Sequence, residues 1–222
     1  MLRIPSFLIA AASAILIYIG YAIFSWLKSY KALQNPAAAF EAALDKLITA
    51  GIKITPGIQE TDIFERWTEK LADYNPLEAL YITLGGSTQY EPYTNFSDSC
   101  WHFDHDTIEG ERAYGTILEN LKRISNGDLG FQNIIDHYND DEDNKAWISF
   151  ELYGDKYKWD LDLNDDWVDS YLFDKIQDLC RKYNKKRRLA YLSAGQGFVI
   201  SYLTADEFNK ISEMTQLQLK LF

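Results

Sequence analysis

The chain carries a long stretch without a charged side chain, from Ile4 to Leu27. The hydrocarbon core of a bilayer is about 30 Å thick and a helix rises about 1.5 Å per residue, so about 20 apolar residues cross it. The 24 residues of this stretch are therefore long enough to span a membrane. The pattern predicts an N-terminal single transmembrane helix over residues 4–27.

A cleaved secretory signal and a buried helix of a soluble domain are the two alternatives for this stretch. A signal has an apolar region of about 7–15 residues that ends at a small-residue cleavage site, whereas the small residues 10–14 lie in the middle of this run. Aromatic side chains gather in its second half, and Lys28 and Lys31 follow, as is typical of a retained anchor at the lipid–water boundary. We therefore expect residues 1–31 to be a single-pass signal-anchor with its flanks.

The charges and the cysteines do not decide which side of the membrane the rest of the chain faces. Arg3 precedes the stretch and Lys28 and Lys31 follow it, but the positive-inside rule needs a clear imbalance. Cys100 and Cys180 fit a disulfide in an oxidising compartment and two buried thiols equally well. Orientation and disulfide pairing both stay open.

Residues 32–222 have the composition of one folded, soluble domain. The chain is 47% hydrophobic and 15% aromatic, which is too apolar for a disordered segment. With 33 acidic and 22 basic residues, its net charge is −11. Phosphate backbones are bound by clustered Lys and Arg, so we expect no nucleic-acid partner. The one basic cluster, residues 181–188, follows a predicted helix and suits its dipole; contact with headgroups or RNA is the alternative.

Periodic hydrophobic patterns divide this domain into helices and mainly antiparallel strands. Asn35-Pro36 has the form of a helix start, and Thr204 to Glu207 that of a capping box. The apolar run Leu77–Leu84 is predicted to be a strand, and Gly154-Asp155 is a hairpin signal between two later strands. The pattern indicates an α+β domain with about four to five helices. Helices are expected near 36–50, 63–74, 111–125, 168–183 and 204–214, and strands near 52–55, 77–84, 101–104, 130–137, 145–153, 156–163, 189–192, 197–203 and 216–222.

His102, Asp104 and His105 form a pattern that could bind a transition metal or act as an acid–base pair. On a strand, His102 and Asp104 point to the same side. The third histidine, His137, is distant in sequence, and no HExxH or paired CxxC motif supports a metal. A polar strand face that runs into a turn is the alternative, so we predict no metal, no cofactor and no catalytic residue, and keep these three only as candidates.

An acidic segment follows in the second half of the chain. Asp160 and Asp162 alternate with apolar residues, which places both carboxylates on one face of a strand. The acids that come next lack the glycine that a calcium-binding loop needs for its sharp turn. We expect Asp165 or Asp166 to cap the helix that begins near Val168; an exposed acidic binding face is the alternative.

Several strings of the chain belong to one pattern: Ala146–Phe150, Tyr157–Asp160, Asp165–Asp169 and Ala194–Gly197, together with Leu77–Leu84 and Cys100–Phe103. This pattern resembles that of immunity proteins, the small bacterial domains that accompany polymorphic toxins. The resemblance implies a domain that binds a cognate toxin and blocks its active site, and it supplies no catalytic residues. It covers about residues 50–222. For the whole chain, the resemblance implies that the predicted anchor lies in the bacterial inner membrane.

The sequence therefore predicts a membrane-anchored binding protein, not an enzyme, that neutralises a basic secreted toxin through an acidic, aromatic-rich surface. The alternatives are a structural or adaptor subunit of a bacterial envelope complex and a membrane-tethered metal-dependent enzyme. The lipid bilayer is the second expected partner, through residues 4–27. The predicted partner-binding residues are Tyr90, Tyr93, Asp140, Asp141, Glu142, Asp143, Asp160 and Asp162, and a solvated surface is the alternative for each of them.

Overall fold

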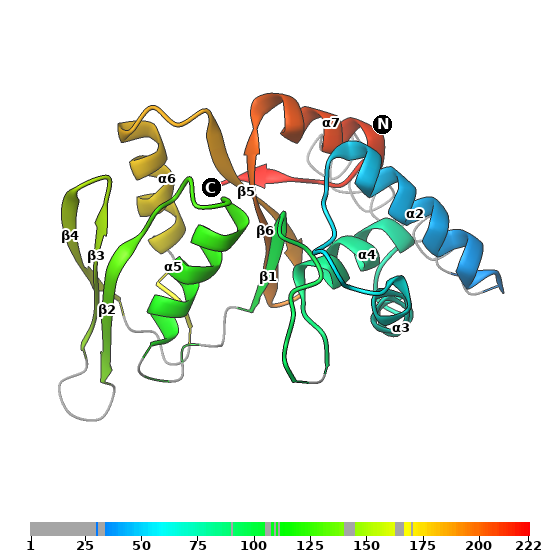
Figure 1. The fold of residues 1–222 in the computed structure, drawn as a ribbon, viewed down its shortest axis with the longest axis horizontal. Helices are drawn as coiled ribbons and strands as arrows, with labels where there is room; N and C mark the ends of the chain where they lie inside the picture. The colour runs from blue at the N-terminus through cyan, green and yellow to red at the C-terminus, as the bar shows by residue number, and fades with distance from the viewer. Residues whose placement is uncertain are drawn as a thin grey trace, which may run out of the picture.

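A four-stranded antiparallel sheet, in the order β1-β6-β5-β7, runs through the middle of the molecule (Figure 1). The structure, a computed structural model, describes Tyr30 and residues 34–222 except for positions 90, 105–107, 109, 111, 140–144, 163–166 and 170. In these residues the chain is α+β, with six helices and a second antiparallel sheet in the order β2-β3-β4. The helices are α2 (Pro36–Ala50), α3 (Glu60–Lys70), α4 (Pro76–Gly85), α5 (Ala113–Ile124), α6 (Leu172–Lys182) and α7 (Ala205–Thr215). The strands are β1 (Cys100–Asp104), β2 (Gln132–Asn139), β3 (Lys145–Leu152), β4 (Asp155–Leu161), β5 (Arg187–Ala194), β6 (Gly197–Thr204) and β7 (Lys220–Leu221).

Strand β6 is covered on both of its faces. Successive side chains of a strand point to opposite sides of the sheet. Val199 and Leu203 belong to one hydrophobic cluster, whereas Ile200 and Tyr202 belong to another. Strand β6 pairs with β1 on one side and with β5 on the other, so the central sheet separates two cores.

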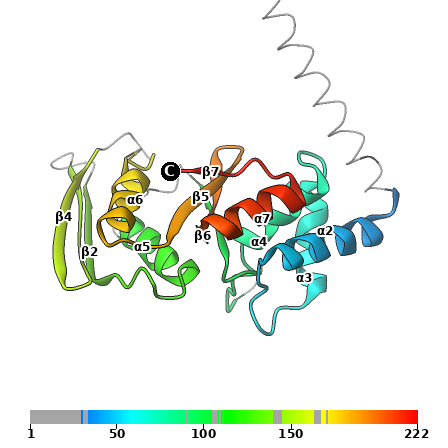
Figure 2. The same cartoon turned by 90° about the horizontal axis from the view of Figure 1, so that it is seen from above.

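The first core lies between the central sheet and helices α2, α3, α4 and α7 (Figure 2). The side chain of Trp67 in α3 is fully buried there, and its Nε1 donates to the carbonyl of Pro76 at 2.9 Å. The hydroxyls of Tyr81 and Ser201 share a hydrogen bond of 2.6 Å inside this core. That bond satisfies two buried polar groups and fixes α4 against β6.

The second core lies between the other face of the central sheet, helices α5 and α6, and the inner face of the β2-β3-β4 sheet. Phe150 of β3 contacts Phe131 edge-to-face, with ring centroids 5.3 Å apart. The predicted hairpin between β3 and β4 is confirmed. Its turn holds Tyr153 and Gly154 at positive φ, 53° and 89°, as a tight two-residue turn requires.

The predicted fold, a transmembrane helix followed by a domain with four to five helices, is wrong. The described residues contain six helices and two separate sheets, and no helix among them is long and apolar enough to cross a membrane. Their longest helix, α2, has 15 residues, fewer than the about 20 that a span requires. Residues 4–27, where the spanning helix was predicted, lie outside the described residues.

The run Leu77–Leu84, predicted as a strand, is helical and forms most of α4. The side chain of Asn75 accepts hydrogen bonds from the backbone N–H groups of Leu77 and Glu78, and Pro76 stands in the first turn. Almost every side chain of α4 is buried, because α2 and α3 cover it on one side and the central sheet on the other. A helix that is apolar all round has no 3.6-residue pattern. A short apolar run of this kind therefore fits a buried strand as well as a buried helix.

The remaining helix starts follow the predictions in part. Asn35 and the Thr204–Glu207 capping box are confirmed as N-terminal caps of α2 and α7. Asp165 and Asp166, predicted to cap α6, lie outside the described residues. The turn before α6 is held by the buried carboxylate of Asp169, which accepts from the N–H of Tyr171 at 2.7 Å.

Replacement of Gly85 by alanine tests how closely α4 approaches β1. A Cβ at this position would lie 2.6 Å from the backbone nitrogen of His102. Although alanine is the better helix former, we expect Gly85→Ala to lower the free energy of unfolding by about 1–3 kcal/mol, because the two backbones must separate. Urea denaturation measures the change. Gly130→Ala is the control, since its Cβ would meet only the carbonyl of Gly127 at 3.4 Å; a stabilised Gly85→Ala variant would contradict the close approach.

Candidate functional site

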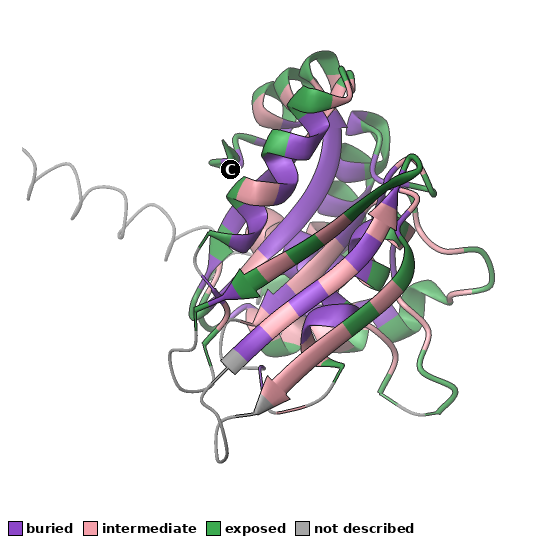
Figure 3. Cartoon of the chain, turned by 90° about the vertical axis from the view of Figure 1, so that its left-hand side faces the viewer, coloured by how far each residue is buried: buried purple, intermediate pink, exposed green. Residues whose placement is uncertain are grey.

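The outer face of the β2-β3-β4 sheet is open to solvent (Figure 3). In this view, none of the described helices lies in front of the sheet. Ile135 is 59% exposed on this face. Trp147 stacks on His137 with ring centroids 5.8 Å apart, and the Nζ of Lys158 lies 4.2 Å from the centroid of the Trp147 ring. The face thus carries an ordered aromatic and cationic group around Trp147 of its central strand, beside an exposed apolar side chain.

One end of this face is acidic. Asp160 of β4 pairs in register with Trp147 of β3, and both Asp160 and Asp162 are exposed. The acidic run Asp140, Asp141, Glu142 and Asp143 lies outside the described residues. It joins Asn139 to Lys145, which pair with each other at the end of the sheet where β4 finishes. Asp160 and Asp162 therefore lie at the same end of the sheet as Asn139 and Lys145, the residues between which the acidic run stands.

The predicted aromatic residues do not belong to this face. Tyr93 is 66% exposed, but it lines a cleft beside Arg66 and Lys70 of α3. In Figure 1 and Figure 2, α3 and the β2-β3-β4 sheet lie toward opposite ends of the molecule. Tyr90 lies outside the described residues. The structure therefore does not bring Tyr93 together with Asp160 and Asp162.

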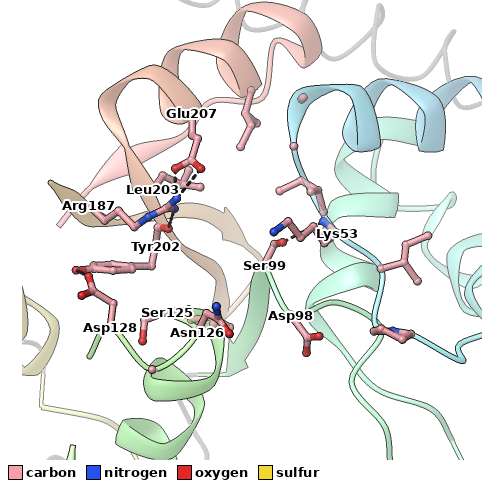
Figure 4. A pocket seen from close by; sticks show the side chains of 18 residues that line it. Lys53, Asp98, Ser99, Ser125, Asn126, Asp128, Arg187, Tyr202, Leu203 and Glu207 are labelled. Carbon is pink, nitrogen blue, oxygen red and sulfur yellow. Dashed lines mark hydrogen bonds and ion pairs between the residues drawn. The ribbon is translucent and has the colours of Figure 1, made fainter. Parts of the chain in front are cut away.

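A cleft of about 720 Å³ opens between the end of α2 and the part of the central sheet where β6 leads into α7 (Figure 4). Lys53 and Ser99 stand on one side of it, and Arg187, Tyr202 and Glu207 on the other. Arg187 forms an ion pair with Glu207 at 2.6 Å and donates to the carbonyl of Tyr202 at 3.0 Å. The same Glu207 completes the capping box of α7, so this wall of the cleft is held by bonds that also support the fold.

Asp128 joins three parts of the chain at the floor of this cleft. Its carboxylate accepts from the Nζ of Lys185 at 2.7 Å and from the hydroxyl of Tyr202 at 2.9 Å, while its backbone carbonyl accepts from the hydroxyl of Tyr153. Burial raises the pKa of Asp128, but the bonds from Lys185 and Tyr202 outweigh it, so the pKa lies below its usual value. The ionised carboxylate therefore contributes to stability.

The two serines that line this cleft are hydrogen-bonded to backbone groups. The hydroxyl of Ser99 accepts from the backbone of Lys53, and that of Ser125 bonds to the backbone of Lys122 and Leu129. Neither serine has a histidine among the described lining residues. The described residues thus contain no nucleophile–base pair in this cleft.

The cysteines lie in different cores and are free thiols. Cys100 is buried in the first core and Cys180 in the second. Burial raises the pKa of the Cys100 thiol to about 12, so at neutral pH it carries no reactive thiolate. Both are structural side chains of the two cores.

His102 and Asp104 do not form a metal site with other described residues, in which no group of three possible ligands is found. His105 lies outside the described residues. Burial, and then the charge of nearby Lys70, lower the pKa of His102, while Asp104 opposes them. A cationic neighbour such as Lys70 disfavours a metal ion at His102. The sequence predicted only Asp104 and His105 as neighbours of His102.

Several exposed residues of interest were missed from the sequence. Trp147 precedes the buried Ile148 on the same strand. Because successive side chains of a strand point to opposite faces, this position indicates that Trp147 faces outward. Its contacts with His137 and Lys158 come from two neighbouring strands, and only the strand register reveals them. The cleft that holds Arg66 and Lys70 depends on tertiary packing and left no pattern in the sequence.

Comparisons of the chain with protein-family models, with curated proteins and with solved structures found no match in any of the three. The assignment of a function therefore rests on the surfaces described above.

The free energy of unfolding at acid pH tests the hydrogen bonds that Lys185 and Tyr202 donate to Asp128. A carboxyl whose pKa is lowered by folding stabilises the protein above its unfolded-state pKa of about 3.9, and this contribution is lost as the pH falls through the lower folded-state pKa. We expect Asp128→Asn to lower the free energy of unfolding by about 1 kcal/mol at pH 7, with a smaller difference below about pH 4. Urea denaturation at several pH values measures it. Asp45→Asn, at an exposed position of α2, is the control and should leave the free energy of unfolding nearly unchanged. If Asp128→Asn lowered the free energy of unfolding equally at every pH, the stabilising role of the ionised carboxylate would be contradicted.

Proposed function

We propose that this chain is a binding protein that neutralises a basic partner protein, a secreted toxin, by holding it against the outer face of the β2-β3-β4 sheet. The observation that carries the proposal is the open face itself, on which Ile135 is exposed, His137 stacks on Trp147, and the Nζ of Lys158 lies over the Trp147 ring. Tight interfaces are anchored by a few large side chains, tryptophan above all, surrounded by polar groups. This face has that composition.

The positions of the acidic residues support a basic partner. The chain has a net charge of −11, and Asp160, Asp162 and the flanks of the run 140–143 lie at one end of the face. Charge of one sign attracts an oppositely charged protein and orients its approach, which raises the association rate. The cationic Lys158 lies beside Trp147. A partner that is basic throughout would be repelled there, so Lys158 would favour a partner with an acidic group at this point.

Two features of the prediction from sequence stay predictions. One is that the chain is not an enzyme. The location at a membrane depends on residues 4–27, which lie outside the described residues. Neither is needed for binding through the sheet face.

Co-expression of the full chain with a secreted toxin encoded beside it tests the proposal. We expect the chain to restore growth and to bind the toxin in a pull-down. Trp147→Ala should weaken binding by about 30-fold or more, as the loss of a central tryptophan does. The double variant Asp160→Lys, Asp162→Lys should slow association at low salt, with little difference at high salt.

The controls separate binding from folding. The double variant Glu41→Lys, Asp45→Lys makes the same change of charge on the exposed face of α2, and it should bind as the unaltered chain does. Urea denaturation shows whether the Trp147→Ala variant is folded. Binding without restored growth would point to an adaptor subunit, and unchanged binding by Trp147→Ala and by the Asp160, Asp162 double variant would reject the sheet face.

A further inference from the structure

A second cleft, of about 370 Å³, lies between α3 and the segment that joins α4 to β1. Its polar lining includes Arg66, Lys70, Ser87, Gln89 and His102. No Asp or Glu is among the described residues that line it, although the chain as a whole carries 33 acids against 22 bases. In so acidic a protein, a concave site lined by cations and hydrogen-bond donors is a distinct feature.

The donors of this cleft are available to a ligand. The side chains of Lys70 and His102 have no hydrogen-bond or ion-pair partner within the described residues. Arg66 binds Glu69 through one nitrogen at 2.9 Å. That pair is exposed to solvent, and exposed pairs of this kind are weak enough for a ligand to compete for the guanidinium.

We propose that this cleft binds the phosphate group of a phosphomonoester. A phosphomonoester carries about −1.5 to −2 charges at neutral pH. The two cations Arg66 and Lys70 match this charge more closely than they match the single charge of a carboxylate. The planar guanidinium can donate two parallel bonds to phosphate oxygens. A volume of about 370 Å³ accommodates a small organic group beside the phosphate.

Two further side chains extend the site. Because its pKa is lowered by burial and by Lys70, His102 is neutral at pH 7 and has one ring N–H to donate. Tyr93, at the edge of the cleft, is 66% exposed and offers an aromatic surface to the organic part of the ligand. The site is independent of the proposed toxin-binding face, which lies toward the other end of the molecule.

Proton NMR of the full chain tests this site. The chain has three histidines, and the spectrum of His102→Gln identifies the His102 resonance. Titration with glycerol phosphate, at constant ionic strength, should shift that resonance with saturation and leave His137 unchanged. The phosphomonoester could come from a soluble metabolite or a lipid headgroup, so flotation with phosphatidylcholine vesicles, with and without phosphatidic acid, is the second arm.

Matched variants decide whether the cations of the cleft are responsible. We expect Lys70→Gln and Arg66→Gln to weaken binding about tenfold or more, as loss of a charge-assisted bond does. Arg181→Gln is the control for Arg66→Gln, because it breaks an equally exposed pair three residues apart on α6, between Arg181 and Asp178. It should leave binding unchanged.

Binding of either probe that is lost in Lys70→Gln supports the phosphate site, and the arm that responds identifies the source. No saturable effect of glycerol phosphate at about 10 mM, a concentration that would fill most of a site with a Kd of about 1 mM, together with no preference for phosphatidic acid, would overturn it. Equal binding of sulfate or acetate would also overturn it, because the site would then attract anions in general. The Trp147→Ala variant should bind glycerol phosphate normally, so failure of this proposal and failure of the toxin-binding proposal are distinguishable.

Discussion

The two faces of β6 are the constraint on which the rest of the described structure depends. A strand with apolar side chains on both sides must be covered twice, and here Val199 and Ile200 enter different cores. Helices α2, α3, α4 and α7 cover one face of the central sheet, and α5, α6 and a second sheet cover the other. The second sheet closes a core with its inner face, so its outer face is exposed to solvent.

Local signals in the sequence were sufficient wherever an element has a polar side or a marked end. The caps at Asn35 and Thr204 and the turn at Gly154 were predicted because each depends on residues next to one another in the chain. Helix α4 was mistaken for a strand because it is buried nearly all round, so its hydrophobic pattern carries no period. Its type is revealed by Asn75-Pro76, a cap of the same form as Asn35-Pro36.

The candidate binding surfaces were less accessible to prediction than the fold. Simple alternation predicted Asp160 and Asp162 on one face of a strand; both are exposed, and Asp162 lies one residue beyond the end of β4. The stack of His137, Trp147 and Lys158 requires the register of three strands, which alternation does not supply. The cleft around Arg66 and Lys70 requires the approach of α3 to the segment before β1, a contact between parts of the chain that share no local pattern.

The pairing of β1 with β6 also governs when the protein becomes complete during synthesis. Cys100 lies opposite Ser201, so the first core cannot close until the ribosome has made nearly all of the chain. Contacts so distant in sequence slow folding and leave early helices exposed in the meantime. A chain released before β6 is made would therefore leave the apolar faces of the helices of the first core uncovered, so early termination gives a species prone to aggregation rather than a smaller folded domain.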